Sequence, residues 1–306
     1  MKRRRRESHV ANTARESLHN RRGLLRVELG LLGEADASAA LALSTAEGWN
    51  QTLEDWRRVI RLEPSGCFAA RKGPRLIGTV TTTAYRSATA WIGMMIVQSD
   101  FRRQGIGAAL MRLALDYVHS LGIANVKLDA TPEGQPLYES RGFTAEAEIQ
   151  RWQGVARTAA NPNPQHSTGE PYLPLFALDQ AAYGADRSSL LKQLIVEGLG
   201  RPLLVHSDHG VPAGYALARR GRTAKYVGPI VATTASAVGQ LLDGMLARFA
   251  GEDVCLDLHR NGLLAPEVLA AQGLSKRRIL TRMRFGLWSD AGAPPSICAS
   301  AGPEFG

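Results

Sequence analysis

The sequence predicts an α/β fold built as two similar domains in tandem. Three observations predict it. Short strand-type runs alternate with helix-type runs along most of the chain. The pattern of the first half returns in weaker form in the second half. The length of 306 residues fits two average domains, and a stretch rich in proline, asparagine and serine between the halves suits a linker.

The first half contains a regular succession of strand and helix signals. The apolar run at 90–97 is typical of a strand buried on both faces. After it, Leu110, Ala114, Tyr117, Val118 and Leu121 recur with helical spacing, and Gly122 suits the end of that helix. The elements predicted here are, in order, a strand at 24–29, helices at 35–46 and 52–62, a hairpin of strands at 67–71 and 76–85, a strand at 90–97, the helix, a strand at 125–130, a helix at 135–141 and a strand at 143–152.

The second half repeats this pattern. The stretch RPLLVHSDHGVPAGYALARR resembles GCFAARKGPRLIGTVTTTAY, GPIV resembles MMIV, and VCLDL resembles VKLDA. Each half then has a short helix that ends in glycine, at Gly142 and Gly273, and a closing strand. We interpret this as an internal duplication. The spacing from Val97 to Leu128 is 31 residues, whereas that from Val231 to Leu256 is 25, so about six residues are missing in the second half where the first has FRRQGIG.

Composition shifts give the expected domain boundaries. We expect a basic, disordered tail at 1–22, a first domain at 23–156, a linker at 157–170, a divergent second domain at 171–288 and a disordered tail at 289–306. The last segment consists mostly of small residues and proline, which is typical of disorder.

The charge is uneven along the chain. Six of the nine net positive charges fall within residues 1–22. We interpret that segment as a disordered arm or the result of an upstream start, with a phosphate-backbone or anionic-lipid contact as the alternative. Apart from that tail, nucleic acid is not an expected partner. Membrane is not expected either, because no apolar run approaches the ~18 residues of a membrane span. Three widely spaced cysteines favour a reducing cytoplasm over a disulfide framework.

The loop FRRQGIG has the chemistry of an anion site. The first turn of a helix has N–H groups without partners, and Gly105 and Gly107 would let an anion approach the backbone. Arg102 and Arg103 add positive charge, and Gln104 can donate hydrogen bonds. A dinucleotide loop would need glycine at position 110, which is leucine, and the Gly-Lys-Ser/Thr of a triphosphate loop is absent. An ordinary strand-to-helix turn with incidental arginines remains the alternative.

The run from MMIV through SDFRRQGIGAAL to LYESRGF resembles the GNAT superfamily of acyl-CoA-dependent N-acetyltransferases. The resemblance covers about residues 24–155. The whole chain resembles a bacterial group in which a GNAT domain precedes a divergent one, through GWNQTLEDW, AWIGMM and LDATPEGQPLY and, in the second half, YGADR and YVGPIVA. This resemblance implies two tandem domains, each a mixed, mostly antiparallel sheet flanked by helices.

The resemblance also implies a site for acetyl-CoA. The strand ending at Val97 would splay from the strand at 126–130, and pantetheine would lie along Met95, Ile96 and Val97. The pyrophosphate would lie on Gln104, Gly105, Ile106, Gly107 and Ala108, beside Arg102 and Arg103. Tyr138 would be the general acid at the coenzyme sulfur, with an aromatic packed under the last strand as the alternative. Many relatives have asparagine where this chain has Thr131, so the contact of Thr131 with the coenzyme is in question.

The acceptor side is less defined. Asp129 and Glu47 are candidate bases, and a water chain would serve equally. Trp49, Asn50 and Gln51 could line the acceptor pocket or form a packed turn. Asp186 and Arg187 could reach the pocket from the second domain or pair with each other. We expect no metal, because His206 and His209 lie in a hairpin turn without a third ligand, and no nucleophilic role for Cys67.

The second half has neither the loop nor the tyrosine, since Leu269 stands where Tyr138 would be, and we expect it not to turn over acyl-CoA. The predicted function is therefore a cytoplasmic N-acyltransferase, monomeric or homodimeric, that moves an acetyl group from acetyl-CoA to the primary amine of a small molecule. The alternatives are a non-catalytic sensor of acyl-CoA or a metabolite, and an acyltransferase acting on a carrier protein or tRNA.

Overall fold

A computed structural model describes residues 16–19, 26–86, 88–157, 172–286 and 296–306 of the chain. It divides into two compact units, residues 1–124 and 125–306, and each is described by itself. The boundary lies well before the linker expected at 157–170. Among the described residues, no helix has both the length and the apolar character that crossing a bilayer would require.

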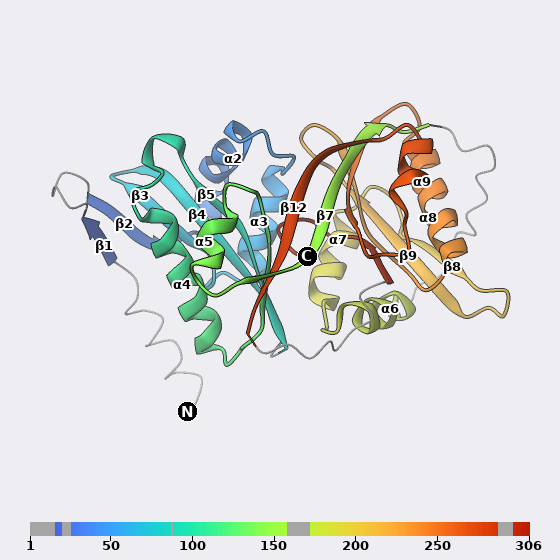
Figure 1. Ribbon diagram of the computed structural model, residues 1–306, viewed down its shortest axis with the longest axis horizontal. Coiled ribbons are helices and arrows are strands. Elements are labelled where there is room, and N and C mark those ends of the chain that lie inside the picture. The colour runs from blue at the N-terminus through green and yellow to red at the C-terminus, as the bar shows by residue number, and fades with distance from the viewer. Residues whose placement is uncertain (1–15, 20–25, 87, 158–171, 287–295) are drawn as a thin grey trace. The chain divides into compact units, whose positions relative to one another are not determined.

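The first unit is an antiparallel sheet with helices packed on it (Figure 1). A capping box opens α3, where Thr52 and Asp55 accept hydrogen bonds from each other's backbone N–H. Gly78 lets α4 approach the sheet closely, because a Cβ there would lie 3.2 Å from Leu110 Cδ1. The elements are β1 (Glu16–His19), β2 (Arg26–Leu31), η1 (Glu34–Asp36), α2 (Ala37–Ala46), α3 (Leu53–Leu62), β3 (Phe68–Lys72), β4 (Arg75–Tyr85), β5 (Thr89–Val97), η2 (Ser99–Phe101) and α4 (Ile106–Ser120).

The second unit is a mixed sheet in the order β6-β12-β7-β11-β13-β10-β9-β8. Only β10 and β11 pair in parallel; the other described pairs are antiparallel, as the predicted fold class requires. The elements are β6 (Val126–Ala130), α5 (Gln135–Glu139), β7 (Thr144–Val155), α6 (Leu173–Tyr183), α7 (Ser188–Val196), β8 (Leu203–His206), β9 (Pro212–Arg219), β10 (Lys225–Ala232), α8 (Ala235–Arg248), β11 (Asp253–His259), α9 (Pro266–Ala271), β12 (Ser275–Phe285) and β13 (Ile297–Ala299).

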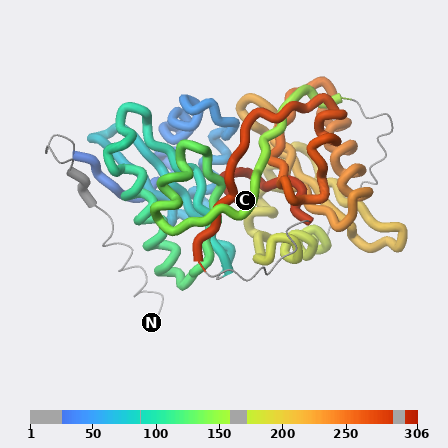
Figure 2. Tube along the Cα trace, viewed as in Figure 1, coloured from blue at the N-terminus to red at the C-terminus, as the bar shows by residue number. Residues whose placement is uncertain are grey.

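The two sequence repeats exchange strands within this sheet. Strand β12 of the second repeat lies between β6 and β7 of the first, and β7 in turn pairs with β11 of the second. Strands β12 and β7 run side by side, although they are far apart in the sequence (Figures 1 and 2). The register joins Arg282 of β12 to Asp129 of β6, and Asp257 of β11 to Arg151 of β7. Strands from both repeats are therefore interleaved in one sheet.

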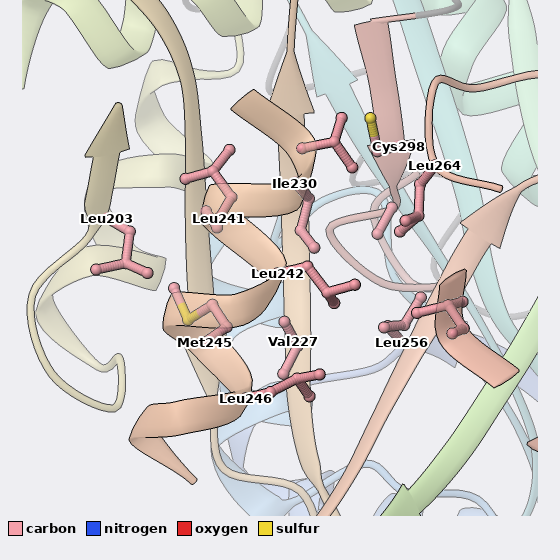
Figure 3. Packing of buried hydrophobic residues seen from close by; sticks show 14 of the residues in the cluster. Leu203, Val227, Ile230, Leu241, Leu242, Met245, Leu246, Leu256, Leu264 and Cys298 are labelled. Carbon is pink, nitrogen blue, oxygen red and sulfur yellow. The ribbon is translucent and has the colours of Figure 1, made fainter. Parts of the chain in front are cut away.

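The core of the second unit lies between α8 and the sheet. Leu241, Leu242 and Met245 on α8 are fully buried and contact apolar side chains of the strands, including Val227 and Leu256 (Figure 3). Burying a side chain of this size contributes about 1.5–3 kcal/mol. This core fixes α8 on the sheet.

The disorder expected in the terminal segments is contradicted at two places. Residues 16–19 form β1, which pairs with β2. The rest of the tail at 1–22 lies outside the described residues. At the other end, β13 pairs with β10 and β11, and Phe305 is fully buried. Residues 289–295 lie outside the described part of the chain.

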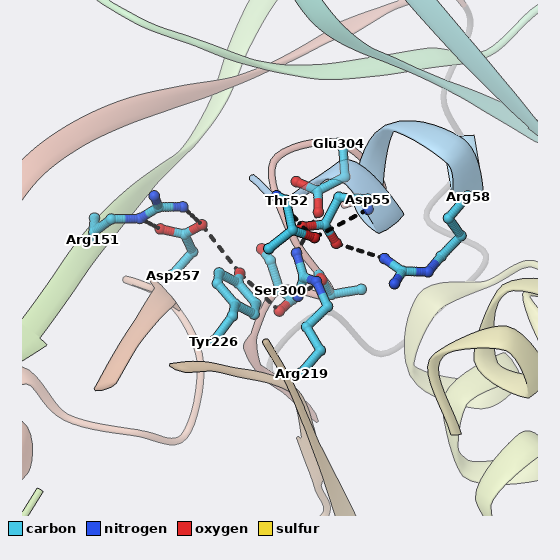
Figure 4. Close-up of polar contacts among 10 residues, drawn as sticks. Thr52, Asp55, Arg58, Arg151, Arg219, Tyr226, Asp257, Ser300 and Glu304 are labelled. Carbon is cyan, nitrogen blue, oxygen red and sulfur yellow. Dashed lines mark hydrogen bonds and ion pairs between the residues drawn. The ribbon is translucent and has the colours of Figure 1, made fainter. Parts of the chain in front are cut away.

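Polar contacts explain why residues 296–306 are ordered despite their small side chains. The buried Arg219 guanidinium forms an ion pair with Glu304 and donates to the Ala301 carbonyl at 2.8 Å. The Tyr226 hydroxyl lies 3.1 Å from both the Ser300 carbonyl and the Asp257 carboxylate (Figure 4). Small residues here allow close packing of the backbone, which composition alone does not distinguish from disorder.

Candidate active site

The predicted site residues are distributed over both units. The loop, β5 and the turn at 49–51 belong to the first unit. Asp129, Thr131, Tyr138, Asp186 and Arg187 belong to the second.

The predicted anion loop joins β5 to α4. Arg103 and Gly105 both have positive φ, at +59° and +82°, which turns the chain sharply into the helix. The first bond of the helix runs from the Ala109 N–H to the Gly105 carbonyl at 3.0 Å. The N–H groups of the preceding helical residues, 106–108, have no intrahelical acceptor, and no side chain caps this helix. Unpaired N–H groups at the positive end of a helix suit a phosphate.

Space at Gly105 fits such a ligand. A Cβ built at this position would meet no protein atom within 4 Å. Residues 102–105 are exposed, and Gly107 and Ala108 are half-buried. The loop therefore presents backbone donors and open space together, as acetyl-CoA binding at this loop would need.

The two arginines of the loop differ. Arg102 donates from Nε to the Val97 carbonyl at 2.8 Å and forms an ion pair with the Glu47 carboxylate. Glu47 therefore holds Arg102, and its role as a base stays a prediction. Arg103 makes no ion pair with any residue in the described part of the chain. Of the two side chains, Arg103 is the one whose charge is not already neutralised by a carboxylate.

A bulge in β5 precedes the residues expected to contact pantetheine. Met94 has φ of +50°, and the pairing register with β4 shifts there. The Thr79 hydroxyl donates to the Met94 carbonyl at 2.8 Å and holds the bulge. Met95 and Val97 are half-buried, and Ile96 is buried. A bulge changes the direction of the following backbone, which is a common device next to active sites.

The turn GWNQ between α2 and α3 lies largely inside the first unit. Asn50 and Gln51 are buried, Trp49 is half-buried, and the Trp49 N–H donates to the Ser44 carbonyl at 2.9 Å. This burial fits the packed-turn interpretation of the sequence. A role in acceptor binding stays a prediction.

Helix α5 carries Tyr138, and Thr131 lies in the turn that precedes this helix. The Thr131 hydroxyl accepts from the Gly134 N–H at 3.2 Å, and its carbonyl accepts from Gln135 N–H at 3.0 Å. A Cβ at Gly134 would lie 3.2 Å from the Tyr138 ring, so glycine leaves room for that ring. Thr131 thus has a structural task at the start of α5, whatever it contributes to a coenzyme.

The Tyr138 side chain is 7% exposed and packs edge-on against Phe143, with ring centroids 6.1 Å apart. None of the described residues hydrogen-bonds to its hydroxyl. Burial raises the pKa of Tyr138 to about 12, so the hydroxyl stays protonated at neutral pH. A protonated hydroxyl without a competing acceptor is suited to donate to a ligand.

Asp129 is engaged by an arginine that the sequence did not single out. Arg282 of β12 donates to both carboxylate oxygens, at 2.8 and 3.0 Å, in a buried bidentate pair. Burial alone would lower the pKa of Arg282, but the Asp129 carboxylate outweighs burial and the pKa is raised. Both oxygens of Asp129 are occupied, so the expectation that it acts as a base is not supported by its contacts.

A buried histidine extends this pair into a network. His259 Nε2 lies 2.9 Å from the Ser300 hydroxyl and 3.2 Å from Arg282 Nη1. Because arginine can only donate, Nε2 accepts and carries no proton. Burial, with the positive charges of Arg282, Arg187 and Lys127, lowers the pKa of His259 well below its usual range. The histidine is therefore neutral.

Arg187 does not pair with Asp186. Its guanidinium holds both carboxylate oxygens of Asp179, at 3.0 and 2.6 Å, and donates to the Gly306 carbonyl. The Asp186 carboxylate instead accepts from the Ser188 N–H at 2.9 Å at the start of α7. The alternative in which the two residues pair with each other is thus wrong, because Arg187 forms a buried ion pair with Asp179. A role of Asp186 in the acceptor pocket stays a prediction.

The second repeat lacks the features of the loop. Where α4 has no side-chain cap, α8 begins at Thr234, whose hydroxyl accepts from the Ala237 N–H at 3.2 Å. Leu269, at the position matching Tyr138, is fully buried. Strand β13 lies between β10 and β11, which correspond by sequence to the strands expected to hold pantetheine in the first repeat.

Sequence reasoning missed Arg282, Thr281 and His259, which come from the second repeat. Arg282 is one of five basic residues on β12, SKRRILTRMRF, and its burial, which the sequence does not reveal, is what requires a partner. The partner, on a strand more than 150 positions earlier, could not be identified without the exchanged topology. The described residues contain no cluster of three or more potential metal ligands.

Comparisons with known proteins agree with both repeats. Residues 37–143 match the Acetyltransferase (GNAT) family, and residues 175–290 match an Acetyltransferase (GNAT) domain. The internal duplication predicted from sequence is thereby confirmed.

Relatives and solved structures extend the similarity to most of the chain. An uncharacterized N-acetyltransferase of Bacillus subtilis, YitH, is 27% identical over 72% of this chain and 78% of its own. A holothin acyltransferase of Pseudoalteromonas is 26% identical over 69% of this chain and 72% of its own. The fold is similar to a crystal structure of a putative acetyltransferase from Pyrococcus horikoshii, with a TM-score of 0.78, 20% identity and coverage of 92% and 96% of the two chains.

Proposed function

Because the chain belongs to the GNAT family of acetyltransferases, as two tandem domains, we propose that it moves an acetyl group from acetyl-CoA to the primary amine of a small molecule. The observation that carries the donor assignment is the uncapped N-terminus of α4, with open space at Gly105. The acceptor assignment is supported by a relative named as an acyltransferase of holothin, which covers two thirds of this chain.

The donor is held by backbone groups in this proposal. The N–H groups of Ile106, Gly107 and Ala108 bind the pyrophosphate, Gln104 and Gly105 complete the loop, and Arg103 supplies charge. Arg102, through Glu47 and the Val97 carbonyl, fixes the loop conformation. Met95 to Val97, after the bulge, contact the pantetheine.

The chemistry is a direct attack of the neutral amine on the thioester carbonyl. The nitrogen–carbon bond forms, the carbon–sulfur bond breaks, the nitrogen loses one proton and the sulfur gains one. Tyr138 gives its hydroxyl proton to the leaving sulfur and regains a proton from the amine through solvent. A pKa of about 12 keeps this hydroxyl protonated over the pH range in which amines react. Ionisation of Tyr138 should therefore not lower the rate below about pH 10.

Substitution of Tyr138 by phenylalanine tests the proposal. General acid catalysis contributes about 10²–10⁴-fold, so Tyr138→Phe should lower kcat by about a hundredfold or more while acetyl-CoA affinity stays unchanged. Release of free coenzyme A in the presence of a panel of primary amines gives kcat, and calorimetry gives the affinity. Tyr172→Phe, the same change at the start of α6, is the control and should leave both unchanged.

Three outcomes separate the possibilities. No binding of acetyl-CoA would contradict the proposed function. Binding without turnover across the amine panel would favour a sensor of acyl-CoA over an enzyme of this acceptor class. Turnover that survives in Tyr138→Phe would leave the acyltransferase in place and refute the acid assignment.

A further inference from the structure

Strand β12 belongs to the second repeat yet contacts the region that carries Tyr138. It pairs with β6 in antiparallel register from Phe285 opposite Val126 to Thr281 opposite Ala130, the last residue of β6. Helix α5 begins five residues later, at Gln135. The strand therefore supports the backbone from which α5 starts.

Three side chains of β12 reach this region. The Thr281 hydroxyl donates to Gln135 Oε1, on the first residue of α5, at 3.1 Å. Arg282 holds Asp129, two residues before Thr131, whose hydroxyl accepts from the Gly134 N–H in the turn that leads into α5. The Phe285 ring lies 5.4 Å from the Phe143 ring, which in turn packs against Tyr138.

The position of the Tyr138 hydroxyl depends on this support. No described residue hydrogen-bonds to the hydroxyl, so only the placement of α5 and the packing of the ring determine where it points. Gln135 lies one helical turn before Tyr138, and its side chain is held from β12 on one side and by Glu139 on the other, at 2.7 Å. A shift of Gln135 would move the tyrosine with it.

We infer that the second repeat contributes to the reaction through Thr281, a positioning residue whose hydrogen bond to Gln135 holds helix α5 so that Tyr138 can protonate the leaving sulfur. The inference rests on the proposed role of Tyr138. Arg282 fixes β12 relative to β6. Its guanidinium is buried and bonded to Asp129, His259 and Ser300, so β12 cannot slide along β6 without breaking a satisfied ionic network.

A single hydroxyl can be removed without emptying the core. Thr281→Val keeps the shape of the side chain, and Gln135 is only partly buried, so the fold should persist. We expect kcat to fall about tenfold, as small misplacements of catalytic groups cost one to two orders of magnitude, with KM for acetyl-CoA unchanged. Thr281→Ser restores the hydroxyl and should recover most of kcat. Ser275→Ala is the matched control, because it removes a hydrogen bond from the opposite end of β12, to the Gln153 carbonyl.

A double-variant cycle separates positioning from general damage. If Thr281 acts through Tyr138, Thr281→Val should have no further effect on kcat in a chain that already carries Tyr138→Phe. An equal tenfold loss in both backgrounds would overturn the inference and leave the proposed function untouched. Loss of activity in Tyr138→Phe alone, with no effect of Thr281→Val, would also overturn it.

A spectroscopic readout decides the matter independently of turnover. In protein labelled with 3-fluorotyrosine, the fluorine resonance of Tyr138 is the one that disappears from the spectrum when Tyr138→Phe is introduced. We expect Thr281→Val to shift or broaden that resonance, Thr281→Ser to restore it, and Ser275→Ala to leave it unchanged. A resonance unaltered in Thr281→Val would show that the hydrogen bond does not position the ring.

Discussion

At the residue scale, two of the buried ion pairs join strands of different repeats. Arg151 of β7 holds Asp257 of β11, and Arg282 of β12 holds Asp129 of β6, each with two short hydrogen bonds. Removing one partner of such a pair leaves an uncompensated buried charge and costs about 3–5 kcal/mol. The pairs therefore fix which strands lie together.

The buried His259 should make stability depend on pH. Its pKa is lowered in the folded chain, first by burial and then by Arg282, Arg187 and Lys127. The unfolded chain binds a proton near its usual pKa of about 6.5, which the folded chain does not. The stability associated with neutral His259 is thus present above about pH 6.5 and is lost as the pH falls below it. The free energy of unfolding should decrease by up to about 1.4 kcal/mol per pH unit there.

Urea unfolding between pH 5 and 8 measures this slope. His259→Gln keeps an acceptor for Arg282 and should flatten the dependence below pH 6.5. His209→Gln, an exposed residue of the turn between β8 and β9, should leave it as in the unaltered protein. An identical slope in His259→Gln and the unaltered chain would show that other groups cause the dependence.

At the scale of elements, the N-termini of α4 and α8 show how the repeats diverged. Helix α4 follows β5, and α8 follows β10, which is the matching strand of the second repeat. The residue before the first helical turn is Gly105 in α4 and Thr234 in α8. A threonine hydroxyl satisfies a backbone N–H that a glycine leaves for a ligand. The difference separates a helix end that can bind an anion from one that caps itself.

Alanine at Gly105 should weaken coenzyme binding more than its effect on folding explains. The positive φ makes Gly105→Ala cost about 1–2 kcal/mol of stability. The methyl group would also occupy the open space of the loop, and we expect acetyl-CoA affinity to fall at least about tenfold. Calorimetric titration measures the affinity and thermal unfolding the stability.

Gly122 provides a matched control at the other end of α4. It has φ of +76° and, like Gly105, no atom within 4 Å of an added Cβ. Gly122→Ala should therefore cost similar stability and leave the affinity for acetyl-CoA unchanged. Equal losses of affinity in both variants would mean that strain in α4, rather than the loop itself, governs binding.

Local signals predicted the elements well and their partners poorly. The loop, its helix and the strand pattern of both repeats follow from glycines and apolar periodicity, and the structure has them within a few residues of the predicted bounds. The position of β12 between β6 and β7, the partner of Arg187 and the order of residues 296–306 depend on contacts between distant segments. Nothing in the sequence near Asp179 or Phe305 indicates those contacts.

At the scale of the whole molecule, the two copies of the duplication differ in structure. The first repeat keeps the loop and Tyr138, while the second supplies β12 to the sheet and has β13 between β10 and β11. Since β12 and β7 are exchanged, neither repeat completes its sheet alone. We therefore predict that the second repeat supports the first structurally and does not turn over acyl-CoA itself.

From this difference between the repeats we predict that each chain binds one coenzyme. The α8 terminus is capped by Thr234, Leu269 replaces the tyrosine, and β13 occupies the place between the two strands that correspond to those expected around pantetheine. Calorimetry with acetyl-CoA should give a stoichiometry of one. Arg103→Glu, which puts a negative charge into the loop, should then abolish all measurable binding rather than half of it. A stoichiometry of two, or tight residual binding in Arg103→Glu, would place a second site in the chain and contradict this division of tasks.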